Sequence, residues 1–414
     1  MRRDILIIGG GASGLAAALS AAKEAPGARI TLLEGLDRLG KKLLATGNGR
    51  CNLTNRQINP GHYHSSQPEL LSGFLRQMPT ERVLRFFSEL GLCCATEEMG
   101  RVYPYARQAS AVLDTLLLAL EHTDVEVLCS TKVRQVERQD NGFHVLTQDG
   151  RQFCSKALIL AAGGRAAPKQ GTDGTGFALS KQLGHRYATP FPCLVALKCS
   201  DEVVKGLKGI RAQGKVTLLR DGATLGTDQG EIQFTDYGLS GIPVFQLSCL
   251  PGRDFTGVEL SVDLLPKWTR QELVHYLATQ SVRYPQEPLD RFLPGLVHPK
   301  LLRAVMEAAG LSPLSRPASS LSTGQKIKLA DTMKDWRFHV TGPLSWDHAQ
   351  VTGGGVLLEE IGPDFASLLC PGLFPCGEVL DVVGDCGGYN LHWAWCSGLS
   401  AGKTAAQWLG KSDF

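Results

Sequence analysis

Residues 4–14 of the chain read Asp4-Ile5-Leu6-Ile7-Ile8-Gly9-Gly10-Gly11-Ala12-Ser13-Gly14. An apolar run of strand length ends at three consecutive glycines, and the Ala-rich residues 15–24 that follow have helical composition. A second apolar run over 29–34 has a strand pattern and ends in the acidic residue Glu34. Strand, helix and strand within about thirty residues predict a βαβ unit, in which a helix joins two parallel strands.

The glycines have the G-x-G-x-x-G spacing that binds a dinucleotide when it lies between a strand and a helix. Gly9 makes the tight turn, Gly11 lets the backbone approach a pyrophosphate, and Gly14 lets the helix pack closely on the strand. The helix N-terminus at Ala12-Ser13 supplies N–H donors for phosphate oxygens. Glu34 is expected to accept a hydrogen bond from a ribose hydroxyl. A tight turn that binds nothing is the alternative, and the correctly placed strand, helix and acid disfavour it.

A second glycine-rich segment near residue 380 favours FAD over a simple nicotinamide cofactor. A strand pattern over 373–376 leads into Gly377-Glu378, and Gly387-Gly388-Tyr389-Asn390-Leu391 precedes a helical pattern over 394–405. We expect Glu378 to bind ribityl hydroxyls. We expect the amides of 388–391 to lie against the flavin, where the helix dipole stabilises negative charge on the reduced ring. The alternative is a flexible turn before a terminal helix.

The remaining patterns predict an α/β fold: a Rossmann-like FAD-binding domain with three layers and a parallel sheet, interrupted by an insertion. Residues 35–55 look like a loop, and a hairpin is expected over 143–154 with its turn at Asp149-Gly150. Short β-like runs follow from residue 190, and helical patterns run from 269 to 329. We predict the first part of the FAD-binding domain over 1–189, a β-barrel-like substrate domain over 190–266, a helical cap over 267–344, and the second part of the FAD-binding domain over 345–414.

Composition and charge exclude several other classes of protein. Apolar residues make up 43% and charged residues 20% of the 414 positions, which is ordinary for a globular protein. A net charge of +3 is too small to predict nucleic acid as the main partner. The 12 cysteines include no C-x-x-C pair, so we expect reduced thiols and no metal site. No signal peptide and no apolar run of membrane-spanning length is present, so we expect a cytoplasmic protein without a membrane partner.

The chain resembles the HI0933-like (BaiN-type) family of NAD(P)/FAD-dependent oxidoreductases. Its most specific segment is Gly47-Asn48-Gly49-Arg50-Cys51-Asn52-Leu53-Thr54-Asn55. Further matching segments are spread from one end of the chain to the other: Gly9–Gly14, Gly40–Thr46, Ala161–Gly164, Gly353–Val356, Gly377–Asp381 and Gly387–Leu391. The resemblance implies a non-covalently bound FAD, an inserted β-barrel and a helical cap.

The resemblance also implies further cofactor contacts. It places Lys42, Gly47, Arg50, Cys51 and Asn52 along the FAD diphosphate and flavin. Lys42 and Arg50 have the charge to neutralise a diphosphate, although a solvated surface pair is the alternative. Cys51 is interpreted as a packed, inert thiol rather than a redox group, because no second cysteine lies nearby in sequence.

Two more positions follow from related flavoproteins. The backbone of Val133 matches a position that contacts adenine. Ala162-Gly163 matches a turn that carries threonine in those relatives, and Ala162 cannot make the contact of a hydroxyl.

The implied activity is an NAD(P)H-linked reductase of an unsaturated or carbonyl-containing small molecule, as in members that look like bile-acid ring reductases. NAD(P)H is expected as a transient co-substrate, since no second G-x-G-x-x-G appears. One alternative is a flavin amine oxidase, similar to aminoacetone oxidases, that uses O2. Others are a non-catalytic flavin sensor and a tRNA-modifying flavoprotein, which only a few basic residues support: Lys205, Lys208, Arg211 and Lys215.

Proton donors are not identified by the sequence. A flavin reductase often needs a group that protonates the substrate or polarises its carbonyl. The candidates near the flavin-forming segments are Tyr389, His392, Tyr103, Arg101 and His348, and none is singled out. The sequence leaves the oligomeric state open.

Overall fold

A computed structural model describes residues 1–411 and divides the chain into two compact units. The first unit comprises residues 1–192 and those from Ala349 onward, and the second comprises Cys193–His348. Each unit has its own apolar core. Among residues 1–411, no helix combines the length and apolar character needed to cross a membrane.

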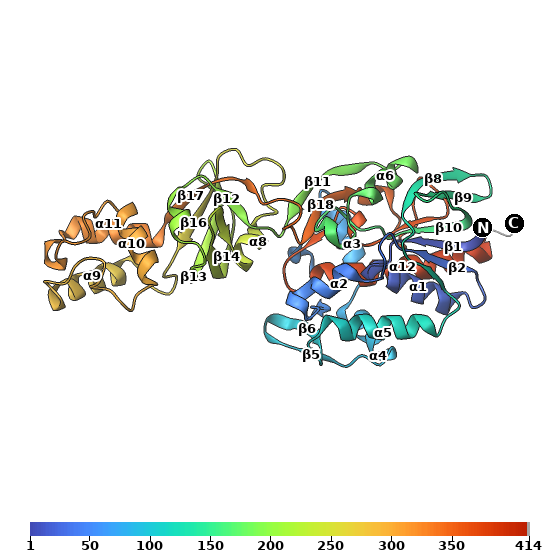
Figure 1. Cartoon of the computed structure of the whole chain (residues 1–414), viewed down its shortest axis with the longest axis horizontal. Helices are drawn as coiled ribbons and strands as arrows, with labels where there is room; N and C mark the ends of the chain where they lie inside the picture. Colours follow the sequence, from blue (N-terminus) through green and yellow to red (C-terminus); the bar gives the residue numbers. More distant parts are fainter. Residues whose placement is uncertain (412–414) are drawn as a thin grey trace. The chain divides into compact units, whose positions relative to one another are not determined.

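The first unit is built on a seven-stranded sheet of mixed direction (Figure 1). Five of its strands are parallel to their neighbours, and a hairpin adds two antiparallel strands at one edge. The strands are β1 (Arg2–Ile8), β2 (Ile30–Leu33), β7 (Glu126–Leu128), β8 (Val133–Gln139), β9 (Gly142–Thr147), β10 (Gln152–Leu160) and β19 (Leu373–Pro375). The predicted fold class, an α/β domain on a parallel sheet with an inserted barrel and helical region, is confirmed.

Strand β10 connects the two ends of the chain. It pairs with β1 along its length, with β9 through residues 152–155, and with β19 through residues 158–160. Because β19 comes from residues 373–375, the C-terminal segment completes the sheet that β1 and β2 begin. The predicted hairpin ended at residue 154, and the structure extends its second strand to Leu160.

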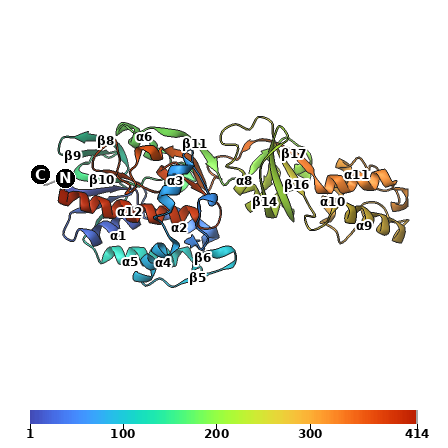
Figure 2. The same ribbon diagram turned by 180° about the vertical axis from the view of Figure 1, so that it is seen from behind.

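Two helices from opposite ends of the chain pack backbone to backbone. Helix α1 (Ala12–Glu24) and helix α12 (Tyr389–Lys411) lie side by side in both views (Figures 1 and 2). A Cβ atom at Gly398 would lie 2.3 Å from the carbonyl oxygen of Ser13, and one at Gly402 would lie 2.2 Å from that of Ala17. Only glycine allows this approach, which brings the N-termini of both helices to the same region.

Several short elements between β2 and α5 (Ala109–Glu121) surround that region. Helix α2 (Lys41–Ala45) lies inside the 35–55 segment that was predicted as a loop, because its Lys, Leu and Ala residues favour a helix despite the flanking glycines. This stretch also contains α3 (Pro68–Leu75), α4 (Thr80–Glu89) and a three-stranded sheet of β3 (Thr54–Asn55), β6 (Arg101–Pro104) and β5 (Cys94–Thr96). Its strand β4 (Tyr63–His64) pairs with β20 (Val383–Gly384) from the C-terminal part of the chain. The other elements of the unit are α6 (Thr175–Gln182) and the pair of β11 (Tyr187–Cys193) with β18 (Val351–Val356).

The second unit contains a closed six-stranded barrel and a helical region. The barrel strands, in order around the barrel, are β12 (Leu197–Cys199), β15 (Gly238–Ser240), β14 (Ala223–Phe234), β13 (Arg211–Arg220), β16 (Val258–Asp263) and β17 (Trp336–Pro343). The helices include α8 (Ile242–Leu247), α9 (Arg270–Arg283), α10 (Pro299–Ala308) and α11 (Thr323–Lys334).

The predicted helical segment 267–344 needs a correction at its C-terminal end. Residues 336–343 form β17, which pairs with β12 and β16 and closes the barrel. Its buried and exposed residues alternate, with Trp336, Phe338 and Val340 inside, so these residues belong to a sheet. Phe234, an aromatic residue that could have lined a substrate site, is fully buried and packs against Phe338 in this core.

The contact between α1 and α12 predicts a stability effect. Gly402→Ala should lower the free energy of unfolding by about 1–3 kcal/mol, because the new Cβ forces the two backbones apart. Gly410→Ala is the matched control, since a Cβ at Gly410 meets no atom within 4 Å. It should be neutral or slightly stabilising, because alanine favours a helix. Denaturant unfolding checks both variants, and equal stability of the two would contradict the packing described here.

Candidate functional site

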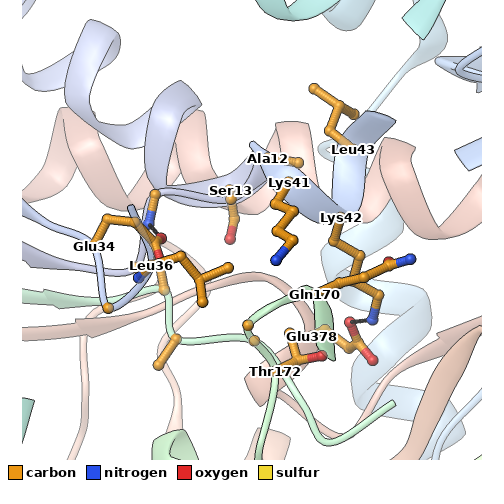
Figure 3. Close-up of a pocket in the computed structure, with 18 of the residues that line it drawn as sticks. Ala12, Ser13, Glu34, Leu36, Lys41, Lys42, Leu43, Gln170, Thr172 and Glu378 are labelled. Atoms are coloured by element: carbon orange, nitrogen blue, oxygen red, sulfur yellow. Dashed lines mark hydrogen bonds and ion pairs between the residues drawn. The ribbon is translucent and has the colours of Figure 1, made fainter. Parts of the chain in front are cut away.

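The candidate site is a cavity at the carboxyl ends of the parallel strands, the usual place for a ligand in an open α/β sheet. Its wall is formed by the residues that follow β1, β2 and β10, namely Gly9–Ser13, Glu34–Leu36 and Ala161–Gly163. Helix α2 and the first turn of α12 complete it (Figure 3). Segments from both ends of the chain therefore build one cavity.

The first glycine turn has the geometry that the motif requires. Gly9 has a φ of +105°, and a Cβ there would lie 2.3 Å from the carbonyl oxygen of Ala161. A Cβ at Gly14 would lie 1.8 Å from the carbonyl oxygen of Gly9, so Gly14 permits the close packing of helix on turn. At Gly11 a Cβ would meet no protein atom within 4 Å and would project into open space. Gly11 is also the N-cap of α1 and has no side chain to cap the helix, so N–H groups of the first turn remain available to an anion.

Glu34 stabilises this turn from the neighbouring strand. Its carboxylate accepts hydrogen bonds from the backbone N–H of Gly10 and of Leu36, both at 2.8 Å. The side chain lines the cavity and retains acceptor capacity, since a carboxylate offers about four lone-pair sites. The expected hydrogen bond to a ribose hydroxyl stays a prediction.

Positive charge is concentrated at one side of the cavity. Arg38 and Lys41 line it, and neither has an ion-pair partner among residues 1–411. Lys41 extends into the cavity between Ser13 and Lys42 (Figure 3). Lys42 forms an ion pair with Glu378, with Nζ and Oε2 2.7 Å apart. The sequence analysis assigned Lys42 to the diphosphate, and Arg38 and Lys41 lie in the same basic segment.

Arg50 does not supply the charge that was expected of it. Its guanidinium lies over the ring of Tyr103, 4.7 Å from the centroid, and 3.9 Å from a carboxylate oxygen of Glu97. It is absent from the cavity lining. Its position is explained by a cation–π contact with Tyr103 and a weak ion pair with Glu97, so Lys41 and Arg38 replace it as candidate diphosphate ligands.

An unsatisfied polar atom lies next to Gly388, outside the cavity lining, where a Cβ at Gly388 would be 2.8 Å from Oδ1 of Asn52. Asn52 is buried, and its Oδ1 atom has no hydrogen-bond partner among residues 1–411. Asn390 and Leu391, in the first turn of α12, line the cavity nearby in the fold. A buried carbonyl without a donor costs free energy unless a ligand or water supplies one, and the N–H of a flavin is a donor of the required kind.

Gly387 and Gly388 have a different role from the one that was expected. A Cβ at Gly388 would lie 2.5 Å from the carbonyl oxygen of Thr54, and one at Gly387 would lie 3.1 Å from the Tyr389 ring. Gly388 also has a φ of +99°. Protein packing therefore requires glycine at position 388 whatever lies in the cavity, and a larger residue there would not report on a flavin.

The structure divides the predicted cofactor residues into two groups. Those in the cavity lining are Gly9, Gly11, Ala12, Ser13, Glu34, Lys42, Val133, Ala162, Gly163, Glu378, Asn390 and Leu391. Those outside the lining are Gly14, Gly47, Arg50, Cys51, Asn52, Gly377, Gly387, Gly388 and Tyr389. Cys51 is fully buried, and burial raises the pKa of its thiol to about 12, as expected of a packed, inert thiol.

Some lining residues were not predicted at all. The loop Gln170–Asp173 contributes to the wall, and so do Gln350, Val351 and Val382. No local signal connects these residues to β1, because only tertiary folding brings them together.

His392 has the contacts of a structural residue. It is fully buried, with Nδ1 2.8 Å from Oγ1 of Thr54 and Nε2 2.9 Å from the carbonyl oxygen of Met78. Burial lowers the pKa of its imidazole to about 4, so the ring is neutral near pH 7. With both nitrogens engaged inside the protein, His392 is withdrawn as a candidate proton donor.

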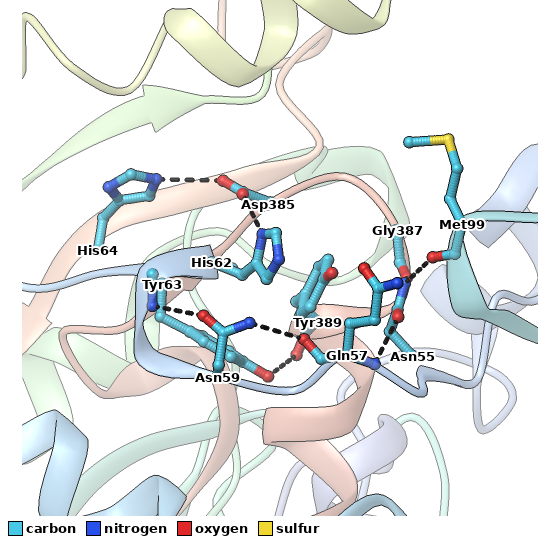
Figure 4. Close-up of polar contacts among 12 residues, drawn as sticks. Asn55, Gln57, Asn59, His62, Tyr63, His64, Met99, Asp385, Gly387 and Tyr389 are labelled. Atoms are coloured by element: carbon cyan, nitrogen blue, oxygen red, sulfur yellow. Dashed lines mark hydrogen bonds and ion pairs between the residues drawn. The ribbon is translucent and has the colours of Figure 1, made fainter. Parts of the chain in front are cut away.

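The other catalytic candidates differ in exposure. Tyr103 is buried under Arg50, while Arg101 is half-buried and His348 is exposed in the second unit. Tyr389 is buried at the start of α12, and burial raises the pKa of its phenol to about 12, with Asp385 acting in the same direction. A cluster that the sequence analysis missed adjoins Tyr389 and contains His62, His64 and Asp385 (Figure 4).

The residues present fit FAD. A helix N-terminus and two unpaired cations lie where a diphosphate would need them, and Glu34 lies beside the first glycine turn. Asn390 and the N-terminus of α12 provide a second polar region in the lining, and the orphan oxygen of Asn52 lies close by, next to Gly388. No group of three or more His, Cys, Asp and Glu side chains within residues 1–411 has the arrangement of a metal site.

Comparisons with known proteins agree with this arrangement. Residues 3–404 match the model of the HI0933-like protein Rossmann domain. The chain is 38% identical over 405 residues to a 3-dehydro-bile acid delta(4,6)-reductase of Clostridium scindens, covering 97% of this chain and 98% of that protein. It is 29% identical over 398 residues to a ribosomal RNA dihydrouridine synthase of Haemophilus influenzae, covering 95% and 96%. An E. coli quinol fumarate reductase structure, FrdA, matches the fold with a TM-score of 0.53 at 16% identity, covering all of this chain and 71% of its own.

Lys41 provides a direct test of the cavity. Lys41→Met should weaken FAD binding about ten- to a hundred-fold, because a hydrogen bond to a charged group is worth about 1.5–3 kcal/mol. Titration of the apoprotein with FAD, followed by quenching of flavin fluorescence, measures the change. Lys23→Met is the matched control, because Lys23 is 77% exposed in an ion pair with Glu89 outside the cavity. Equal FAD affinity of the two variants would remove Lys41 from the site.

Proposed function

The chain belongs to the HI0933-like family of oxidoreductases, and on that premise we propose that it is an FAD-dependent reductase of a conjugated ketone of the bile-acid or steroid type. NAD(P)H is proposed as the transient hydride donor. The observation that carries the proposal is full-length similarity, at 38% identity, to a 3-dehydro-bile acid delta(4,6)-reductase. FAD, when bound, supplies hydride chemistry.

The chain's own residues are proposed to hold the cofactor along the cavity. Lys41 and Arg38, with the first turn of α1, bind the diphosphate, because they combine positive charge with free N–H donors. Glu34 accepts from the adenosine ribose. At the other end, Asn52 accepts a hydrogen bond from the flavin, and the N-terminus of α12 stabilises negative charge on the reduced ring.

Lys42 and Glu378 are proposed to orient the middle of the cofactor. The Glu378 carboxylate accepts from the backbone N–H of Thr352 at 2.9 Å as well as from Lys42 at 2.7 Å. Both side chains are about one-fifth exposed, so the pair is partly shielded from water. We propose that Glu378 accepts from ribityl hydroxyls while the ion pair holds it in place.

A second candidate function is the reduction of a base in RNA. Two relatives at 28–29% identity are ribosomal RNA dihydrouridine synthases that match this chain almost end to end. The basic residues that would support RNA binding are largely neutralised, however. Lys205 pairs with Glu202, Lys208 with Asp236 and Arg211 with Glu231. Since affinity for nucleic acid depends on unpaired positive charge, the small-molecule reductase is the preferred proposal.

An anaerobic experiment separates these functions. Holoenzyme is mixed with NADH or NADPH, and loss of flavin absorbance reports hydride transfer to the protein. The reduced protein is then divided among a 3-oxo-4,6-unsaturated bile acid, ribosomal RNA at physiological salt, and O2 with or without an amine. We expect the bile acid to restore the flavin absorbance fastest. Faster reoxidation by RNA would favour the dihydrouridine synthase, and amine-dependent reduction with O2 would favour the oxidase. No reaction in any arm would contradict the proposed reductase and favour a sensor.

A further inference from the structure

Two histidines share one carboxylate next to the start of α12. Nδ1 of His62 lies 3.0 Å from Oδ2 of Asp385, and Nε2 of His64 lies 3.2 Å from Oδ1 of the same residue (Figure 4). A carboxylate accepts hydrogen bonds, so each of these nitrogens carries a hydrogen. The Asp385 side chain is 16% exposed, and it therefore fixes the tautomer and the direction of both rings.

His62 is also held by a ring contact. Its ring stacks on that of Tyr389, with centroids 4.4 Å apart and an interplanar angle of 24°. Within residues 1–411, Nε2 of His62 has no hydrogen-bond partner. The side chain is 34% exposed. The result is a rigidly placed imidazole with one nitrogen unoccupied and within reach of water.

Direct contacts fasten this cluster to the segment that begins α12. Tyr63 donates its hydroxyl hydrogen to the carbonyl oxygen of Tyr389 at 3.1 Å, and Nδ2 of Asn55 donates to that of Gly387 at 3.0 Å. Asn390, which lines the cavity, donates from Nδ2 to the carbonyl oxygen of Gly384 and accepts at Oδ1 from its N–H. The cluster is therefore joined to the cavity lining through the backbone of residues 384–390 and the side chain of Asn390.

We propose that His62 is the catalytic acid of this protein and that Asp385 is its positioning residue. The assignment rests on the proposed function, the reduction of a conjugated ketone. In that reaction FAD, when bound, would supply a hydride to the β or δ carbon of the conjugated ketone, and the π electrons would move to the carbonyl oxygen. Protonated His62 would give its Nε2 proton to that oxygen, and the resulting enol would become, in water, a ketone with one C=C bond fewer.

The half-exposed position of His62 suits this role. After giving up its proton the imidazole is neutral, and water can protonate it again. Asp385 keeps Nδ1 protonated and Nε2 directed outward, as an orienting carboxylate does for a catalytic histidine. Tyr389 contributes its ring as a flat support. Its phenol stays protonated near neutral pH, because burial raises its pKa to about 12.

The competing explanation is purely structural. The contacts of the two histidines with Asp385 would then only stabilise the pairing of β4 with β20, in which His64 lies opposite Val383. The explanations differ in what the loss of His62 changes. A structural tie affects folding and FAD retention. A catalytic acid affects the chemical step and the binding of a ligand that imitates the enol.

The test uses FAD-loaded holoenzyme and the variants His62→Gln, Asp385→Asn and His64→Gln. Each protein is reduced anaerobically with dithionite and mixed with a 3-oxo-4,6-unsaturated bile acid, and flavin reoxidation is followed in a single turnover. We expect His62→Gln to slow this step at least about a hundred-fold, the usual effect of losing a general acid, and Asp385→Asn to slow it less. His64→Gln should slow it by less than about ten-fold, because His64 gives the substrate no proton.

A binding measurement adds a readout that does not depend on turnover. The probe is a steroid with a phenolic A ring, whose hydroxyl imitates the enol, and its control is the same steroid without that hydroxyl. Both are titrated into oxidised holoenzyme and followed by the change in flavin absorbance. His62→Gln should weaken the phenol about ten-fold and leave the control ligand unchanged, since loss of one hydrogen bond costs about a factor of ten.

Each outcome decides between the two explanations. Wild-type enzyme that no conjugated ketone reoxidises overturns the proposed function, and the role of His62 with it. If wild-type enzyme reacts and His62→Gln reacts equally fast, the role of His62 alone is overturned. Loss of FAD from His62→Gln also contradicts the proposal, because His62 is given no part in holding the cofactor. A further variant, His62→Ala, is assayed with and without free imidazole. Restoration of its rate by imidazole supports a chemical role for His62, because a purely structural contact would not be restored in this way.

Discussion

The close approach of α1 and α12 is the constraint on which the rest of the structure depends. Gly398 and Gly402 place one helix backbone directly on the carbonyl oxygens of Ser13 and Ala17. Gly377 is held in the same region, with its N–H donating to Oγ of Ser397 and its carbonyl oxygen accepting from the indole of Trp393. As a result, two segments more than 370 residues apart in the chain supply two helix N-termini to one cavity. A cofactor with a diphosphate at one end and a reducible ring at the other needs such an arrangement.

The sequence predicted the features that depend on local patterns. The βαβ unit, its glycine turn and Glu34 were found because strand, turn and helix signals lie within a short segment. The protein contacts of Arg50 and Gly388 could not be predicted from local patterns, because each involves a distant neighbour: Tyr103 for one and Thr54 for the other. The pairing of His62 with Asp385 spans 323 positions, and no periodicity or spacing could have revealed it. Strand β17 was placed in the helical cap by the predicted boundary at residue 344, because local patterns do not show that it pairs with β12 and β16.

The fold and the chemistry are separable in this family. Relatives that share almost the full length of this chain are named as a 3-dehydro-bile acid delta(4,6)-reductase and a ribosomal RNA dihydrouridine synthase, so the fold alone does not define the substrate. The residues that line the cofactor cavity come from the ends of the sheet strands, from α1, α2 and the first turn of α12, and from the loop of residues 170–173. The cluster of His62, His64 and Asp385 comes instead from the short elements around α12, which makes it the better place to look for what distinguishes one substrate from another. Its neighbours at the flavin end, Asn52 and Asn390, belong to the cofactor side.

The central claim is that the cavity between the two helix N-termini binds FAD, and identification of the bound flavin tests it most directly. Purified protein, reconstituted with an equimolar mixture of FAD and FMN and freed of excess ligand, is precipitated with acid, and the released flavin is identified and counted by chromatography. The account predicts FAD in the supernatant, with one molecule for each chain, because the cations and N–H groups at Gly9–Ser13 and Arg38–Lys41 are suited to a diphosphate. Retention of FMN in preference to FAD, or of no flavin, would contradict it.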